Sequence, residues 1–366
     1  MSARPLRITD PRAVPQGWSA TVRAYVELTK PRIIELLLVT TLPAMIVAAG
    51  GWPGTGLAIA TLAGGALSAG GANTINQVAD RDIDAIMRRT RSRPLPTGRV
   101  SPQAALVFGV LLGLAGFAVL WTTSNLLAAS LSTAGLLFYV FVYTLVLKRS
   151  TPQNIVIGGA AGAVPALVGW AAVTGSLSLA PWVMFAVVFL WTPPHFWALA
   201  LRYREDYEVA GVPMLPATAG EGVALMQIVR YTVMLVAVSL VLFSISGVGV
   251  LYVAAAAVLG SGLLVSAVRL RRRSETAMAF FGASNVYLAA LFTLMALDVY
   301  AGDGGELRAL RTSALVLASL LIVPAAVLSA RSELRPGPGR RATRLIEVLL
   351  PTAGIAALLA VAWALL

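Results

Sequence analysis

The sequence predicts an all-α protein that crosses the membrane many times. Of its 366 residues, 58% are hydrophobic and 12% are charged, and the mean hydropathy is +0.82. A soluble domain carries about twice that charged fraction. The apolar runs are about 20 residues long, which suits membrane-spanning helices and exceeds the strands of a membrane barrel. The bilayer therefore decides the architecture.

Hydrophobic runs predict nine spans in the first 300 residues. They lie at approximately 33–50, 56–79, 102–122, 125–147, 153–174, 180–201, 223–246, 248–268 and 278–299. We expect residues 1–30 to form a cytoplasmic N-terminal arm that ends in an amphipathic segment, and residues 31–300 to form the helical domain. Two further apolar runs, at approximately 309–330 and 345–366, predict two extra transmembrane helices in a C-terminal extension, residues 301–366.

The lysines and arginines predict the orientation. With the N-terminus in the cytoplasm, nearly all of them fall in the N-terminal arm or in loops after even-numbered spans, and the opposite side receives only Arg308 and Arg311. We therefore expect a multi-pass protein of the cell inner membrane. This distribution accounts for the net charge of +12 without nucleic acid. The absence of cysteine excludes disulfides and thiol chemistry, and the first 30 residues show no cleavable signal peptide.

The most informative stretch is residues 73–99, NTINQVADRDIDAIMRRTRSRPLPTGR. If a helix continues through it, Asn76, Asp80 and Asp84 lie one turn apart on one face. Neighbouring carboxylates repel each other, and a divalent cation bridging them to a phosphate would remove that repulsion. The arginines that follow could hold the rest of an anionic ligand, although the topology rule alone also predicts them. They are Arg88, Arg89, Arg91 and Arg93.

A second acidic cluster, Glu205, Asp206 and Glu208, follows the sixth span in LRYREDYEVAGVPMLP. The predicted topology places it on the same side as the first cluster. Two acidic clusters facing one cavity suit a site in which more than one Mg²⁺ holds a diphosphate. The alternative is that these are ordinary loop charges paired with Arg202 and Arg204.

Other candidate residues follow the fourth span or lie within spans. Lys148 and Arg149 could neutralise a departing diphosphate, or they could serve only as topology anchors. Tyr139 and Tyr143 could stabilise a carbocation through cation–π attraction, or simply pack. The single histidine, His195, lies in FLWTPPHFWALAL, and an ionisable group at membrane depth indicates a functional site. The alternative is a hydrogen-bonded structural histidine.

The phrase NQVADRDID, with MRRTRSRPLPTG after it, resembles the first aspartate-rich motif of the UbiA-type intramembrane prenyltransferases. Further phrases narrow the resemblance to the haem-farnesylating branch of that family. They are LTKPRIIELLLVTTLPAM at 28–45, YTLVLKRSTPQNIVIGGAAGAVPALVGWAAVTG at 143–175, WTPPHFWALALRYREDYEVAGVPMLP at 191–216 and YLAALFTLMALD, which ends at 298. The resemblance covers residues 20–300, so the C-terminal extension lies outside it.

The resemblance implies a nine-helix UbiA-type bundle around a central cavity, with Mg²⁺ as cofactor. The implied reaction uses farnesyl diphosphate and turns a vinyl of haem B into a hydroxyethylfarnesyl group, giving haem O. Carried onto matching positions, the metal ligands would be Asn76, Asp80, Asp84 and Asp206, and the catalytic residues Asp80, Asp84, Lys148 and Asp206. The substrate-binding residues would be Asn76, Arg88, Arg93, Tyr143, Arg149, His195 and Tyr203. The implied partners are farnesyl diphosphate, haem B, the lipid bilayer and a haem A synthase or terminal oxidase assembly.

Within this resemblance, His195 would contact a haem propionate, ligate iron or relay a proton. One departure concerns the second motif, which in the superfamily has two aspartates four residues apart. Here Asp206 is followed by Ala210, so Glu205 or Glu208 could substitute.

Three other functions compete with this one. A related enzyme could prenylate a quinone precursor, but the PHF phrase and residues 191–216 favour haem. A transporter would need ionisable groups near the midplane, whereas the charges here lie at the rim. A non-catalytic assembly scaffold leaves the face of Asn76, Asp80 and Asp84 unexplained.

Overall fold

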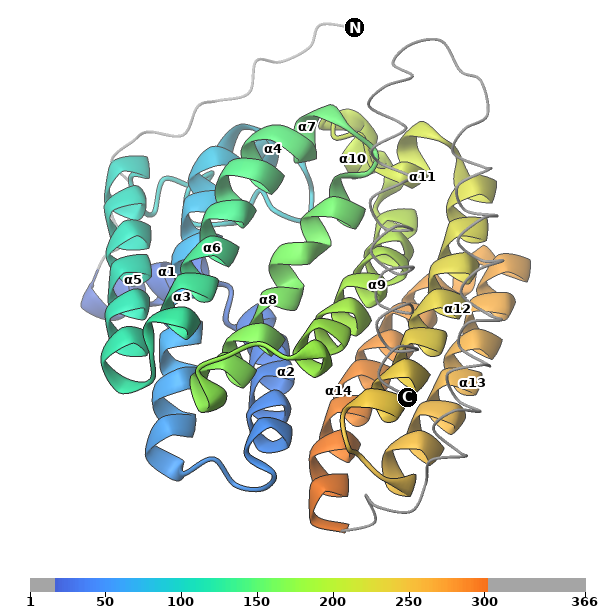
Figure 1. Cartoon of the computed structure of the whole chain (residues 1–366). Coiled ribbons are helices and arrows are strands. Elements are labelled where there is room, and N and C mark those ends of the chain that lie inside the picture. Colours follow the sequence, from blue (N-terminus) through green and yellow to red (C-terminus); the bar gives the residue numbers. More distant parts are fainter. Residues whose placement is uncertain (1–16, 302–366) are drawn as a thin grey trace, which may run out of the picture.

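The computed structural model describes residues 17–301, and their regular structure is entirely helical (Figure 1). Eight stretches in this part of the chain are long and apolar enough to cross a membrane. They are Thr55–Ala79 (α3), Pro102–Thr123 (α5), Leu126–Ser150 (α6 to α7), Asn154–Thr174 (α8), Leu179–Arg202 (α9), Glu221–Ile245 (α12), Val250–Arg272 (α13) and Ser274–Ala301, which includes α14 (Ala277–Ala301).

A further helix, α2 (Pro31–Ala49), packs against α3, α8 and α14 and carries an apolar segment, Leu38–Ala49. These helices match the predicted spans, which confirms the predicted all-α membrane bundle. The two spans expected at 309–330 and 345–366 fall outside the described residues, as does most of the N-terminal arm.

Glycines bring α3 and α5 into direct backbone contact. A Cβ added at Gly71 would lie 2.6 Å from the carbonyl oxygen of Gly109, and one added at Gly116 would lie 2.8 Å from that of Gly64. No side chain fits at such distances, so the two helix backbones touch, as small residues allow in lipid. This contact fixes the depth and rotation of α3, whose last turn carries Asn76.

The centre of the bundle is formed by α9 and α12, whose side chains are buried around almost the whole circumference. Burial on all sides means that neighbouring helices, rather than lipid, surround both of them. Accordingly, α9 packs against α8, α12 and α14. It carries His195 and ends at Arg202, so it links the core to the charged end of the bundle.

Buried Asp298 on α14 holds the opposite end of the bundle together. Its carboxylate accepts hydrogen bonds from the backbone amides of Gly249 and Tyr252, the latter at 3.1 Å. These amides belong to the first turn of α13, which has no partner for them within its own helix. Asp298 therefore caps a neighbouring helix rather than its own.

The short helices gather at one end of the bundle (Figure 1): α4 (Arg81–Ile86), α7 (Lys148–Ser150), α10 (Arg204–Val209) and α11 (Leu215–Thr218). We call this end, comprising Lys30, residues 76–101, 148–154 and 202–218, the charged rim. Its members come from segments far apart in the sequence.

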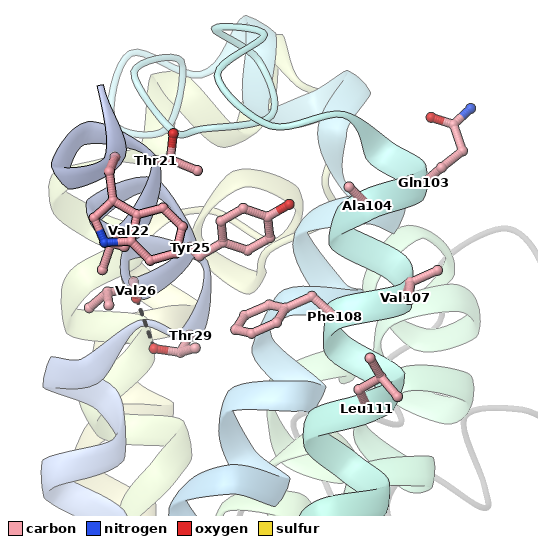
Figure 2. Close-up of a pocket in the computed structure, with 11 residues that line it drawn as sticks. Thr21, Val22, Tyr25, Val26, Thr29, Gln103, Ala104, Val107, Phe108 and Leu111 are labelled. Carbon is pink, nitrogen blue, oxygen red and sulfur yellow. Dashed lines mark hydrogen bonds between the residues drawn. The ribbon is translucent and has the colours of Figure 1, made fainter. Parts of the chain in front are cut away.

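The amphipathic segment expected at the end of the N-terminal arm is a helix, α1 (Trp18–Thr29). It packs beside α5, with the rings of Tyr25 and Phe108 edge to face at 5.0 Å. An apolar groove of about 780 Å³ lies between the two helices. Figure 2 shows the residues that line it. None of the predicted site residues lines this groove.

Candidate active site

The first acidic motif sits where one helix ends and another begins. α3 ends at Ala79, Asp80 has φ −93° and ψ 4°, and α4 starts at Arg81. The expected continuous helix is thus interrupted at Asp80. The Asp80 amide still donates to the Asn76 carbonyl (2.9 Å), and the Asp84 amide donates to the Asp80 carbonyl (2.8 Å). The Asn76 side chain donates to Asp80 Oδ2 at 2.8 Å, so these two side chains meet as predicted.

Asp80 is the most enclosed charge of the rim, with an exposed fraction of 0%. Its Oδ2 atom forms an ion pair with Lys148, and the Arg149 guanidinium lies 3.8 Å from Oδ1. Among the described residues, Oδ1 has no hydrogen-bond partner. A buried carboxylate oxygen left without a donor is costly and has the chemistry of a cation ligand.

The helix that carries Lys148 changes type before it reaches the rim. A π-helix, Phe138–Leu147, replaces the expected α-helical turns. Thr144 Oγ1 donates to the carbonyl of Tyr139, five residues back, at 2.8 Å, and accepts from the Asn76 amide at 3.0 Å. π-Helical turns are rare and frequent at functional sites. Here the wider turn joins the helix to the first motif.

The same π-helix presents two stacked tyrosines beneath the rim. The rings of Tyr139 and Tyr143 lie 5.2 Å apart at an interplanar angle of 29°. A side chain at Gly158 would overlap the Tyr143 ring, so the glycine on α8 makes room for it. Tyr143 packs on the same small hydrophobic cluster as Phe196 and Tyr203. An aromatic wall therefore lies directly under the charged residues.

Lys30 also belongs to the site, although the sequence analysis did not select it. Its amine donates to Asn76 Oδ1 at 2.8 Å. It is the one non-glycine residue of the described chain with a positive φ (55°), at the turn from α1 to α2. Such strain occurs mainly where surrounding structure enforces it. Burial lowers the pKa of Lys30 to about 7, and the positive charges of Arg93 and Lys148 add to this effect.

Two side chains of the first motif hold that strained turn in place. Asn73 Nδ2 donates to the carbonyl of Thr29 at 2.9 Å, and Gln77 Nε2 donates to that of Leu28 at 2.7 Å. They satisfy the last carbonyls of α1, which have no partner within that helix. One face of the α3 terminus thus fixes α1 and Lys30, and the adjacent face carries Asn76 and Asp80.

The arginine-rich loop joins the two acidic motifs. Arg93 pairs with Asp84 at 2.7 Å. The backbone amide of Arg89 donates to Asp206 Oδ2 at 3.3 Å, and its guanidinium lies over the Tyr203 ring, 5.7 Å from the centroid. The predicted ligand Arg88 is 76% exposed and lies 3.9 Å from Asp206. The better-anchored arginine is therefore Arg89, which was one of the four arginines expected to hold an anion but was not among the substrate-binding residues assigned from the resemblance.

The second cluster contributes one buried carboxylate. Asp206 is 9% exposed, whereas Glu205 is 82% exposed and pairs with Arg88 at 3.6 Å. Glu208 forms a surface pair with Arg204 at 2.6 Å, as the loop-charge alternative expected. Exposed pairs of this kind contribute little energy. In this structure both glutamates are thus held in surface pairs, and Asp206 is the buried carboxylate of the second motif.

Arg149 fixes the beginning of α4. Its guanidinium makes two contacts of 2.7 Å with the Asp82 carboxylate and one of 3.0 Å with the Ala79 carbonyl. The hydrogen bond from Arg149 lowers the pKa of Asp82 to about 2. Paired aspartate and arginine in this two-pronged geometry orient each other strongly. Arg149 is therefore as much a structural brace as a candidate phosphate ligand.

His195 lies apart from these ion pairs, between α9 and α14. Its ring is stacked between Trp191 and Phe281, with centroid distances of 4.1 and 4.2 Å. Its Nδ1 atom lies 2.8 Å from Ser284 Oγ. The structure thus brings together all predicted site residues except His195, which occupies a separate aromatic layer next to Phe196.

In the described part of the chain, no three acidic or histidine side chains gather closely enough to hold a metal ion by themselves. Each buried carboxylate of the rim is instead balanced by lysine or arginine. Mg²⁺ in phosphate-binding sites usually takes only one or two carboxylates and completes its shell with phosphate oxygens and water. The unpartnered oxygen of Asp80 fits that requirement.

Residues 37–286 match the UbiA prenyltransferase family, and the chain belongs to this family. It is 56% identical over 282 residues to the protoheme IX farnesyltransferase of Symbiobacterium thermophilum, an alignment that covers 76% of this chain and 94% of that protein. It is 53% identical over 281 residues to the protoheme IX farnesyltransferase of Thermus thermophilus, covering 76% of this chain and 46% of that protein. The chain thus spans about half the length of that relative.

Two solved structures share the fold. A digeranylgeranylglyceryl phosphate synthase has a TM-score of 0.64 and 19% identity, covering 77% of this chain and 99% of its own. A UbiA homologue from Archaeoglobus fulgidus, bound to DMAPP and Mg²⁺, has a TM-score of 0.53 and 17% identity, covering 74% and 98%. At these identities the likeness concerns the architecture, and it confirms the predicted UbiA-type bundle.

Proposed function

We propose that the chain is a Mg²⁺-dependent prenyltransferase that transfers the farnesyl group of farnesyl diphosphate to a vinyl group of haem B. Water adds in the same reaction, and the products are haem O and diphosphate. The observation that carries this proposal is the identity of 56% to a protoheme IX farnesyltransferase across 94% of its length. The ion-paired rim above an aromatic wall supplies matching chemistry.

Asp80 and Asp84, with Asn76, would hold Mg²⁺ from the first motif, and Asp206 would do so from the second. Bound there, the cation would neutralise the diphosphate and ease its departure. A UbiA homologue of the same fold binds both an isoprenyl diphosphate and Mg²⁺. The contacts of Asp206 with Arg88 and Arg89 support a site shared by the two motifs.

Lys148 and Arg149 stabilise the departing diphosphate, because both cations lie at the mouth of the site beside Asp80. Lys30, Arg89 and Arg93 supply further positive charge around the phosphates. As the C1–O bond of the farnesyl group breaks, Tyr143 and Tyr139 face the allylic cation with their π-electrons. The surrounding helices keep water away from the cation.

The vinyl group of haem B then attacks C1 of the farnesyl cation, and a new C–C bond forms. The positive charge moves to the carbon next to the porphyrin ring, where water adds and releases a proton. Tyr203 and His195 border the hydrophobic cluster beneath the rim and would contact this second substrate. We infer that the rim and the N-terminus face the cytoplasm at the inner membrane, which the distribution of lysine and arginine supports. A haem A synthase or terminal oxidase assembly would receive the product.

Haem extracted from a host that lacks its own haem O synthase tests the proposal. Expression of the full chain should yield a haem with the added mass of a farnesyl and a hydroxyl group, and Asp80→Asn should abolish it. An inserted wild-type protein that makes no haem O would contradict the proposal. Assays with 4-hydroxybenzoate or a naphthoate would then test the alternative, a prenyltransferase for quinone precursors.

A further inference from the structure

The hydrogen bonds around His195 determine which of its nitrogens carries the proton. Ser284 Oγ lies 2.8 Å from His195 Nδ1 and 2.8 Å from the carbonyl oxygen of Phe281. A carbonyl oxygen can only accept, so the single proton of the serine hydroxyl is donated to Phe281. The contact of Ser284 with His195 can then be a hydrogen bond only if Nδ1 of His195 donates to the serine oxygen. The two contacts together favour the tautomer with the proton on Nδ1 and the lone pair on Nε2.

The packing around the ring leaves one direction open. Trp191 covers one face of the imidazole and Phe281 the other, with interplanar angles of 21° and 25°. The Trp191 indole is itself fixed, because its Nε1–H donates to the Ser284 backbone carbonyl at 2.7 Å. Among the described residues, Nε2 has no hydrogen-bond partner, although the Nδ1 edge has one. The edge that carries the lone pair is therefore the one left to meet a ligand.

We propose that Nε2 of His195 ligates the iron of the haem substrate, and that Ser284 is the positioning residue that fixes the ring and its tautomer. This inference rests on the proposed function, because it assumes that haem enters the bundle. A contact between Nε2 and a haem propionate would need a proton on Nε2, which the bond to Ser284 places on Nδ1. Metal-binding histidines are commonly held through the other ring nitrogen in this way.

The position of His195 in the bundle suits that role. It lies seven residues before Arg202 at the rim, about 10 Å along the helix. The next residue, Phe196, makes an edge contact with the imidazole and packs on the cluster that also touches Tyr143 and Tyr203. Through Phe196, His195 thus adjoins the aromatic residues that lie under the proposed diphosphate site.

Binding of ferric haem B to the purified full-length protein in detergent micelles tests this assignment without turnover. The wild type should bind haem with the Soret band and resonance Raman pattern of a histidine-ligated iron. His195→Ala should lose that signature, and added imidazole should restore it. Ser284→Ala should weaken haem affinity about tenfold, as expected for a residue that orients a metal ligand. Ser284→Thr, which keeps the hydroxyl, should bind like the wild type.

Ser239→Ala is the matched control. Ser239 is a buried helix serine whose hydroxyl contacts Tyr287 Oη at 2.7 Å, so its loss removes a comparable hydrogen bond away from His195. A folded His195→Ala protein with unchanged haem spectrum would overturn the ligation. Equal haem affinities of Ser284→Ala and Ser239→Ala would overturn the positioning role. If His195→Ala does not fold, the comparison of these two serine variants is the test of the proposal. If the wild type makes no haem O and binds no haem, the proposed function itself fails.

Discussion

Lys148→Met tests whether the ion pairs of the rim stabilise the fold as well as the substrate. The substitution removes the positive charge beside Asp80 and keeps a side chain of similar length. Asp80 is fully buried, and the side chain of Lys148 is 14% exposed. Only the Asn76 amide at 2.8 Å and the Arg149 guanidinium at 3.8 Å would then remain near the carboxylate.

Removing one partner of a buried ion pair typically costs about 3–5 kcal/mol, because the other charge stays buried without compensation. Arg149 and Asn76 remain, so we expect about 3 kcal/mol for Lys148→Met, at the lower end of that range. Asp80→Asn should cost less, about 1 kcal/mol, because Lys148 can turn toward water. The double variant should be close to the wild type in stability, since it contains no unpaired buried charge. The expected coupling energy is therefore about 4 kcal/mol, because the single costs of about 3 and about 1 kcal/mol are both absent from the double variant.

Chemical unfolding in mixed micelles measures these free energies, and haem O formation is measured in parallel. Arg204→Met is the matched control, because it breaks the exposed pair with Glu208 and should cost less than about 0.5 kcal/mol. The double variant should regain stability without regaining activity. If Lys148→Met were as stable as Arg204→Met, or if the two single effects at 80 and 148 simply added, the reasoning about buried charge would be refuted.

Three further perturbations follow from the structure. Asp298→Asn should lower the free energy of unfolding by about 2 kcal/mol, because the asparagine side chain has one oxygen to accept the two backbone hydrogen bonds. An unchanged free energy of unfolding would show that α13 does not need this cap. Gly71→Ala should prevent stable assembly of α3 and α5, whereas Gly65→Ala, which meets open space, should be tolerated; equal yields of folded protein would contradict this. Chelation of Mg²⁺ should strongly weaken the binding of farnesyl diphosphate. Asp206→Ala should raise the Mg²⁺ concentration that this binding requires, and Glu205→Ala should not; equal requirements in calorimetric titrations of the two variants would show that the buried carboxylate is not a ligand.

The sequence predicted the helical architecture well, because a bilayer imposes strong rules on composition. Span length, hydropathy and the side on which lysine and arginine gather suffice to place the helices. The pairing of Asn76 with Asp80 was also predictable, since residues four apart on a helix face each other. The break at Asp80 was not predicted, because no proline or glycine marks it.

The parts of the site that escaped prediction depend on contacts between distant segments. Lys30 reaches Asn76 only because Asn73 and Gln77 cap the end of α1 from 44 and 49 residues away. The choice of Arg89 over Arg88 depends on the path of a loop, and adjacent arginines look alike in a sequence. The π-helix depends on the Thr144 hydroxyl, which donates to the carbonyl of Tyr139 five residues back and accepts from the Asn76 side chain on α3.

The ion pairs of the rim also explain how a membrane protein keeps four aspartates at the mouth of its bundle. Without a ligand, Asp80, Asp82, Asp84 and Asp206 are each paired with a lysine or arginine, so every buried carboxylate of the described rim is balanced. A diphosphate attracts those same cations, so they can turn to the substrate only if the carboxylates receive positive charge in exchange. Mg²⁺ bound with the diphosphate would supply that charge. We therefore expect farnesyl diphosphate and Mg²⁺ to bind cooperatively, each weakly alone, because either one by itself would leave part of the rim with unpaired buried charge.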